Sequence, residues 1–279
     1  MITCKELPGQ SFATQDEMYK ALVENMPLIL SVSKNAFKAA DSFTFSYVEE
    51  FKSETEVVKA NKPVTVNDIS ELKVRVVMNT TNLLDSHGDV HIKGLWNRSL
   101  SHTDKRLHLQ EHKKAFDAVI ADNSTAYVKT LAWKTLGANY DGSTQALVFD
   151  SVVKQSRNPF MFEQYKNGYV TNHSVGMQYV DMVYCINSNE DWAKDYKENW
   201  DKYYPIIANK EDADARGYFS AVTEAKLVEG SAVLFGSNNI TPTLDNNMKS
   251  EPDSPSEENT DPALATQHEA QKNYFNLNL

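Results

Sequence analysis

Short segments with the composition of β-strands recur through the middle of this chain, and they limit its fold more than any other feature. Residues 72–78 (LKVRVVM) carry the clearest pattern, and weaker ones follow at residues 126–131, 146–153, 170–183 and 226–235. Runs that are rich in β-branched and aromatic residues and bounded by turn residues are typical of strands. The sequence therefore predicts a mostly β domain with peripheral helices, an architecture that is compatible with a barrel.

The first 65 residues stand apart from this pattern. Apolar residues recur at helical spacing from residue 15 to about residue 30, with acids at the start and Pro27 near the end. This spacing predicts one helix. Residues 43–48 (FTFSYV) alternate between apolar and polar side chains and predict a strand. We therefore expect an N-terminal extension at residues 1–65, whose role is unclear, and a main domain at residues 66–245.

The composition changes again after residue 245. Residues 246–279 contain three prolines, several serines and asparagines, and more acidic than basic side chains. Such a composition predicts a disordered acidic tail. The whole chain has a formal net charge of −10. That charge argues against nucleic acid and against an anionic membrane surface as partners, because both would require basic patches on the protein.

The sequence also predicts an intracellular protein without a membrane anchor. No apolar run approaches the ~20 residues that a spanning helix needs, and the first residues lack the apolar core of a secretory signal. Cys4 and Cys185 are far apart in the sequence. Two such cysteines are typical of free thiols in a reducing compartment rather than of a disulfide framework.

Three residues spread over the main domain could form a hydrolytic site. Ser174 lies in a strand-like segment (NHSVGM), His112 lies upstream, and Glu229 lies in a downstream strand. A serine hydroxyl becomes a nucleophile only when a base removes its proton, and that base needs an orienting partner. From spacing alone, an ordinary small residue in a sheet is the stronger interpretation of Ser174. His173 should face away from Ser174 in a strand, so we do not expect it to be the base.

Residues 108–112 (HLQEH) offer a different chemistry. They fit the H-x-x-E-H pattern of inverted zinc peptidases. On a helix, His108 and His112 would share one face and could hold a zinc ion. The surrounding residues alternate as in a strand, which would hold the two side chains about 13 Å apart. A zinc metallopeptidase is therefore the weaker alternative.

An acidic turn at residues 85–89 (DSHGD) contains His87 and is followed by His91. Asp85 and Asp89 could act as a carboxylate pair in acid–base chemistry. Aspartate and glycine more often build turns, because the aspartate side chain accepts hydrogen bonds from its own backbone. The sequence therefore favours a polar surface turn here over a metal site or a catalytic pair.

Four of these segments together resemble one known family, the phage prohead proteases that mature the capsid. Residues 85–100 (DSHGDVHIKGLWNRSL) are similar to the D-x-x-G-D stretch of that family. Residues 109–113 (LQEHK) resemble the histidine segment of the family, and residues 174–177 (SVGM) resemble its serine segment. Residues 227–233 (LVEGSAV) resemble the strand that carries its third residue. The four segments fall in the order that the family has.

The resemblance implies a β-barrel like that of the herpesvirus assembly proteases, ringed by helices. It implies Ser174 as the nucleophile, His112 as the general base and Glu229 as the third catalytic residue. The implied activity is that of a serine endopeptidase which cleaves scaffold and capsid-shell proteins inside the immature phage head, in the host cytoplasm. No cofactor is implied, and self-cleavage and a homodimer are left open. The alternative from another class is a non-enzymatic head assembly or scaffold protein on the same fold.

Overall fold

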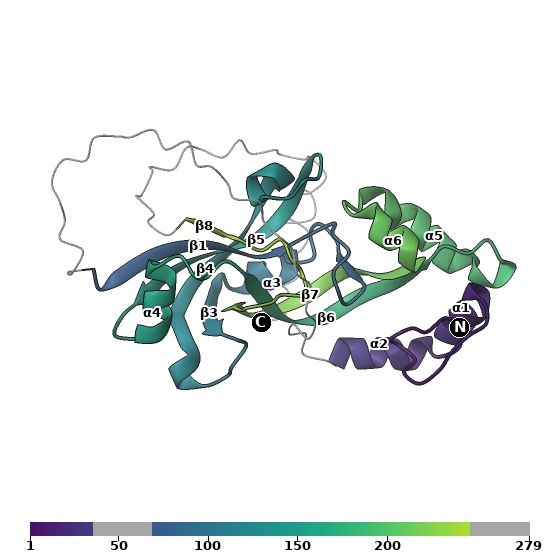
Figure 1. Cartoon of the computed structure of the whole chain (residues 1–279), viewed down its shortest axis with the longest axis horizontal. Coiled ribbons are helices and arrows are strands. Elements are labelled where there is room, and N and C mark those ends of the chain that lie inside the picture. The colour runs from purple at the N-terminus through teal and green to yellow at the C-terminus, as the bar shows by residue number, and fades with distance from the viewer. Residues whose placement is uncertain (36–68, 246–279) are drawn as a thin grey trace, which may run out of the picture. The chain divides into compact units, whose positions relative to one another are not determined.

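The computed structural model describes residues 1–35 and 69–245 of the 279-residue chain (Figure 1). The strand predicted at residues 43–48 and the acidic tail predicted at residues 246–279 lie outside the described residues. Within the described ranges, no helix combines the length and the hydrophobicity that a membrane crossing requires.

The strands of the described residues form one mixed, eight-stranded sheet. Its order is β2-β7-β3-β4-β5-β1-β8, and β6 pairs with β7 off this path. The bounds of the strands are β1 Glu71–Thr80, β2 Asp89–His91, β3 Lys105–Gln110, β4 Val119–Ala132, β5 Ser143–Lys154, β6 His173–Ile186, β7 Tyr218–Ala232 and β8 Thr243–Asp245. The prediction of a mostly β domain with peripheral helices is confirmed.

Strand β7 pairs with three other strands of the sheet. Strand β6 pairs antiparallel with β7 along its whole length. On the other edge of β7, β2 pairs with its first half and β3 with its second half, both in parallel. Segments that are far apart in the sequence are therefore neighbours along one strand, as the green and blue ribbons of Figure 1 indicate.

The sheet does not close into the barrel that the sequence analysis expected. Within the described residues, no hydrogen-bonded ladder joins β6 to β1 or to β8. Strand β5 pairs with one edge of β1, and β8 pairs with the other. There Val76 pairs with Thr243, and the Val77 amide donates to the Pro242 carbonyl at 3.0 Å. Because that edge is already occupied, β6 approaches β1 only through side chains of a shared apolar core.

The helices cover the sheet and are short. The largest apolar cluster joins β1, β5, β6 and β7 to helix α4 through Phe162, which is fully buried. A second cluster places Trp200 of α5 against Phe219 of β7, with ring centroids 5.1 Å apart. The bounds of these helices are α3 Asn97–His102, α4 Pro159–Lys166, α5 Lys194–Tyr203 and α6 Lys210–Arg216, with 3-10 turns at Phe116–Ala118, Trp133–Leu136, Asp191–Ala193 and Tyr204–Ile206.

The single helix predicted over residues 15–30 is wrong, because two helices lie there. They are α1, Gln15–Glu24, and α2, Met26–Asn35. Pro27 lies in the first turn of α2, where the N–H that proline lacks would have no helical partner. Proline therefore starts the second helix instead of ending the first.

Helix α1 packs against the ends of the two long strands. Its buried side chains Met18, Tyr19 and Leu22 share an apolar cluster with Tyr184 of β6 and Tyr218 of β7. The ring centroids of Tyr19 and Tyr218 lie 6.1 Å apart in an edge-on contact. The described N-terminal residues are thus part of one core with the sheet.

Gly230 of β7 marks a close approach across the core. A Cβ at this position would lie 2.7 Å from Met78 of β1 and 2.7 Å from the ring of Phe149 of β5. We expect Gly230→Ala to lower the free energy of unfolding by about 1–3 kcal/mol, because overpacking forces neighbours off their rotamers. Urea denaturation measures this change.

A double-mutant cycle separates the close contact from other effects of the added methyl. The Met78→Ala change removes one of the two side chains that the new Cβ would meet and leaves Phe149 room to shift, so its cost and that of Gly230→Ala should be less than additive. Strictly additive costs would contradict a steric explanation.

Candidate functional site

Ser174 and Glu229 share one face of the β6–β7 strand pair. In the antiparallel register Ser174 pairs with Ser231, and Gly176 pairs with Glu229. Residues paired directly across two strands point to the same face, and so do residues two apart in one strand. The side chains of Ser174, Ser231 and Glu229 therefore lie together. We call the face that carries them, opposite the apolar core, the outer face.

His112 reaches the outer face from the end of β3. That strand ends at Gln110, and Glu111 and His112 then adopt left-handed backbone, with φ of 52° and 54°. Residues other than glycine rarely adopt this conformation, so contacts must hold it. The main-chain N–H of His112 donates to the Ser231 hydroxyl at 3.1 Å, and the Leu234 N–H donates to the Glu111 carboxylate at 3.0 Å. The turn carries the imidazole over β7.

The His112 imidazole is held by the Glu229 carboxylate. His112 Nδ1 lies 2.7 Å from Glu229 Oε1, and the two side chains are 9% and 3% exposed. The second carboxylate oxygen accepts a hydrogen bond from the Ser231 hydroxyl at 2.7 Å. A carboxylate only accepts, so Nδ1 carries the proton and Nε2 of the neutral ring is the basic nitrogen. This is the orientation that a general base requires.

Ser174 lies beside this pair without completing it. Its side chain is buried, and it sits opposite Ser231, one strand spacing of about 5 Å away. Within the described residues, no hydrogen bond joins the Ser174 hydroxyl to His112. Catalytic hydrogen bonds are often long in unliganded enzymes and tighten only around the substrate. The structure thus brings His112 and Glu229 into contact and places Ser174 next to them.

Ser231 is a site residue that the sequence reasoning missed. Its hydroxyl accepts from the His112 main chain and donates to Glu229, so one side chain fixes both members of the pair. A signal for it exists in the sequence. Residues two apart in a strand share a face, so a hydroxyl two positions after Glu229 was placed to contact the same carboxylate.

His108 does not share a site with His112. It is fully buried on the core side of β3, with Nδ1 at 3.0 Å from the Ser151 hydroxyl and Nε2 at 3.1 Å from the Tyr165 hydroxyl. Both ring nitrogens are therefore engaged. No group of three or more metal-binding side chains occurs in the described part of the chain. The zinc alternative fails here, because the left-handed turn at residues 111–112 sends the second histidine to the outer face.

A buried chain of hydrogen bonds lies on the core side of β6. The Tyr165 hydroxyl lies 2.9 Å from His173 Nε2 and 3.1 Å from His108 Nε2. His173 Nδ1 lies 3.0 Å from the Thr241 carbonyl, which can only accept. One proton pattern satisfies every contact: His173 donates to the carbonyl, Tyr165 donates to His173, and His108 donates to Tyr165.

Burial keeps this chain neutral. It lowers the pKa of His173 to about 4, holds the pKa of His108 well below its usual value, and raises the pKa of Tyr165. His173 therefore has a structural partner on the side of the sheet opposite Ser174. This placement agrees with the expectation that it is not the base for that serine.

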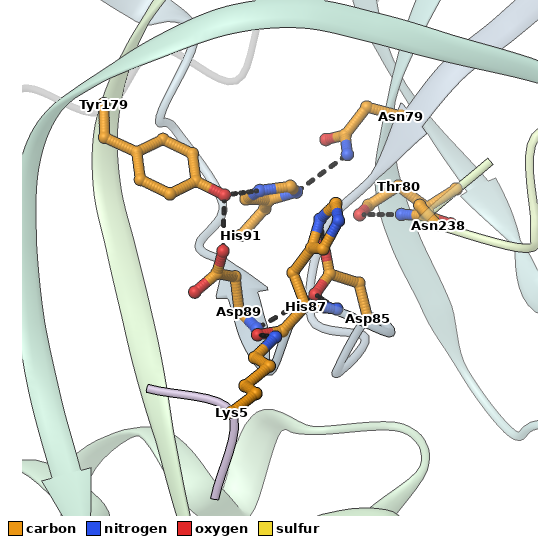
Figure 2. Close-up of polar contacts among 9 residues, drawn as sticks. All are labelled: Lys5, Asn79, Thr80, Asp85, His87, Asp89, His91, Tyr179 and Asn238. Atoms are coloured by element: carbon orange, nitrogen blue, oxygen red, sulfur yellow. Dashed lines mark hydrogen bonds and ion pairs between the residues drawn. The ribbon is translucent and has the colours of Figure 1, made fainter. Parts of the chain in front are cut away.

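The expectation of a surface turn at residues 85–91 is wrong. Asp85, Asp89 and His91 are 8%, 5% and 1% exposed. Figure 2 shows the reason: the Tyr179 hydroxyl donates to Asp89 at 2.7 Å and lies 3.3 Å from His91, whose other nitrogen contacts Asn79 at 2.8 Å. The segment continues into the sheet as β2 beside β7, where Asp89 and His91 have hydrogen-bond partners.

The turn chemistry that the sequence suggested is nevertheless present. Asp85 Oδ1 accepts from the main-chain N–H groups of His87 and Asp89, each at 2.9 Å. Burial, and next the charge of Asp89, raise the pKa of Asp85. Lys5 from the N-terminal segment donates to the His87 carbonyl and covers the turn, as Figure 2 shows. These contacts assign the acidic turn a structural role.

Comparisons with known proteins add no assignment. No family model matches this chain, no curated protein matches it, and no solved structure matches it.

Proposed function

We propose that this protein is a serine endopeptidase of the prohead type. The observation that carries the proposal is the 2.7 Å contact between His112 Nδ1 and Glu229 on the face that Ser174 shares. In the proposed acyl transfer, His112 Nε2 takes the proton of Ser174, and the Ser174 oxygen attacks the peptide carbonyl. The imidazolium then gives this proton to the amine that leaves as the C–N bond breaks, and water, activated by the same imidazole, releases the acyl group and restores Ser174. Glu229 holds the tautomer and stabilises the imidazolium that forms.

The proposed substrates are scaffold and capsid-shell proteins inside an immature phage head, in the host cytoplasm. Support comes from the segments of resemblance, three of which supply the site: residues 109–113 carry His112, 174–177 carry Ser174, and 227–233 carry Glu229. The mostly β fold with peripheral helices is compatible with a distant relation to the herpesvirus assembly proteases, with the sheet left open.

The second candidate is a non-enzymatic head assembly or scaffold protein on the same fold. One observation favours it: in the described ranges, Ser174 and His112 are not joined by a hydrogen bond. Under this alternative the His112–Glu229 contact only stabilises the turn after β3. The two candidates differ in whether the serine hydroxyl reacts.

The test is to express the chain together with the scaffold and shell proteins that the proposal assigns to it as substrates, and to measure the masses of those proteins. We expect processing by the wild type and a loss of about 10³-fold or more in the Ser174→Ala variant, with unchanged thermal unfolding. Ser220→Ala is a matched control, because Ser220 lies in the same pair of strands, on β7, and is 5% exposed, as Ser174 is.

A serine-directed fluorophosphonate gives a second readout. The proposed mechanism predicts one added phosphonyl mass on Ser174 and none in the His112→Ala variant, because the unassisted hydroxyl is a poor nucleophile. Normal processing by the Ser174→Ala variant would exclude Ser174 as the nucleophile. Absence of processing by the wild type, with no labelling, would favour the assembly protein.

A further inference from the structure

A cavity of about 850 Å³ opens beside the candidate site. It lies between α3, the start of β3 and the middle of β6 and β7. Its walls are strongly basic although the whole chain has a formal net charge of −10. The basic side chains in these walls are Arg98, His102, Lys105, Arg106, Lys114 and Lys226, against the single carboxylate of Glu224. Such a concentration of positive charge on an acidic protein favours an anionic ligand.

Arg106 gives the cavity a buried charge that forms no ion pair in the described residues, although the charge of the nearby Asp104 acts on it. It is 8% exposed, and its Nη atoms donate to the main-chain oxygens of Lys105 and Ser99 at 2.9 and 3.0 Å. Its Nε is buried and has no hydrogen-bond partner in the described ranges. Burial lowers the pKa of Arg106. A guanidinium that is removed from water with a donor left unpaired is costly, and an incoming carboxylate would accept that hydrogen bond.

The other arginines of the described residues differ from Arg106 in this respect. Each of them forms an ion pair with a carboxylate at 3.0 Å or less: Arg75 with Asp150, Arg98 with Glu224, Arg157 with Asp122, and Arg216 with Glu6. Of the two arginines that line the cavity, Arg98 thus has an ion-pair partner and Arg106 has none in the described residues.

A β-bulge places the cavity and the candidate site on the same face. Glu229 and Leu227 pair with consecutive residues of β6, so Val228 between them is the extra residue of the bulge. Leu227 is buried in the core. Lys226 therefore faces outward together with Glu229, although an unbroken strand would place these two side chains on opposite faces.

An extended polypeptide along the outer face would reach both features. Ser174 and Gln178 are four residues apart in β6, which is about 13 Å at the rise of a strand. Gln178 pairs with Lys226, and both line the cavity. A bound peptide covers the same distance with about four of its own residues. A side chain a few residues from the reacting bond would therefore enter the cavity.

We propose that this cavity is a subsite that binds an acidic side chain of the polypeptide substrate. Arg106 lies at its wall to receive the carboxylate in charge-assisted hydrogen bonds, and Lys105 and Lys226 add positive charge at the exposed rim. The inference rests on the proposed endopeptidase function, because it makes the cavity part of a substrate cleft. It adds to that function a preference for glutamate or aspartate near the cleaved bond.

The binding test uses the Ser174→Ala variant, so that no turnover occurs. The probes are fluorescein-labelled peptides of alternating Glu and Ala or of alternating Gln and Ala, followed by fluorescence anisotropy. We expect the acidic peptide to bind about tenfold more tightly or better, which corresponds to one charge-assisted contact. Its affinity should fall as salt is raised, because part of the attraction comes from the exposed lysines.

Two sets of variants locate the binding. Arg106→Gln should remove most of the preference for the acidic peptide. Because this change could unfold the protein, a second variant combines Lys105→Gln with Lys226→Gln. Both side chains are exposed, so this variant tests the charge of the cavity without disturbing the core. It should weaken binding about tenfold. The control is Lys73→Gln with Lys129→Gln, which removes the same charge from exposed positions outside the cavity and should change the affinity about twofold or less.

The outcomes separate this inference from the proposed function. Equal binding of the Glu and Gln peptides, equal losses in cavity and control variants, or tighter binding of a short oligothymidylate would overturn the subsite. A second arm digests a proteome-derived peptide library with the wild type. Cleavage without enrichment of acidic residues would overturn the subsite and leave the peptidase. Selective binding of the Glu peptide without any cleavage would support the cavity as an acidic-peptide site and overturn the peptidase.

Discussion

Replacing Glu229 with glutamine is expected to slow the proposed peptidase by about 10³- to 10⁴-fold. The carboxylate lies 2.7 Å from His112 Nδ1 and takes its second hydrogen bond from Ser231. An amide of the same shape can turn its NH₂ group toward Nδ1, which forces the proton onto Nε2 and removes the basic nitrogen. It also removes the negative charge that stabilises the imidazolium. Single-turnover cleavage of the shell protein measures the loss.

The control for this variant is Glu163→Gln, which makes the same change of charge on α4, where the carboxylate pairs with Lys166 and not with a site residue. It should leave the rate nearly unchanged. Thermal unfolding of both variants tests whether a loss of activity reflects a loss of fold. Full activity in a folded Glu229→Gln variant would mean that the carboxylate only positions the turn after β3.

Lowering the pH from 6.5 toward 4 is expected to destabilise the fold by about 3 kcal/mol through His173 alone. Burial lowers the pKa of His173 from 6.5 to about 4 in the folded state. As the pH falls through this window, the unfolded chain takes up the proton first, so the contribution is complete above pH 6.5 and is lost toward pH 4. His108 acts in the same direction, because burial also lowers its pKa. Urea unfolding on both sides of the window measures the change.

The His173→Gln variant separates this effect from other titrating groups. It should be less stable than the wild type at neutral pH, because Tyr165 and the Thr241 carbonyl lose their partners. Its stability should depend less steeply on pH. Asp85 acts in the opposite sense, since its pKa is raised by burial. The same pH slope in the variant and the wild type would contradict a neutral histidine chain.

The strands could be predicted from the sequence better than their assembly. The run LKVRVVM lies within β1, and the end of β7 lies within the segment predicted at residues 226–235. The open edge could not be predicted in this way. It depends on β8, which pairs with β1 across most of the domain's length in sequence, and a three-residue strand leaves no periodic pattern to recognise.

The sequence predicts residues of the candidate site but not how they are arranged. The sequence indicates His112 and Glu229 as candidates, but their contact depends on left-handed backbone at two residues that are not glycine. Nothing in their side chains marks such a turn, because hydrogen bonds to Ser231 and Leu234 hold it. The burial of Asp85 and Asp89 was missed for a related reason. Polar composition predicts exposure unless distant partners such as Tyr179 are known.

The extra residue at Val228 determines which side chains of β7 face the same side of the sheet. Lys226 and Glu229 are three positions apart, and they reach the same side only because the strand contains one insertion between them. Deleting Val228 would restore regular pairing, with Leu227 still in the core and Lys226 still on the side of Glu229, now two positions away in the sequence. A related chain without the insertion would carry its basic residue two positions before the glutamate instead of three to preserve the same selectivity. Alignments that ignore this shift by one would therefore compare a surface position with a core position.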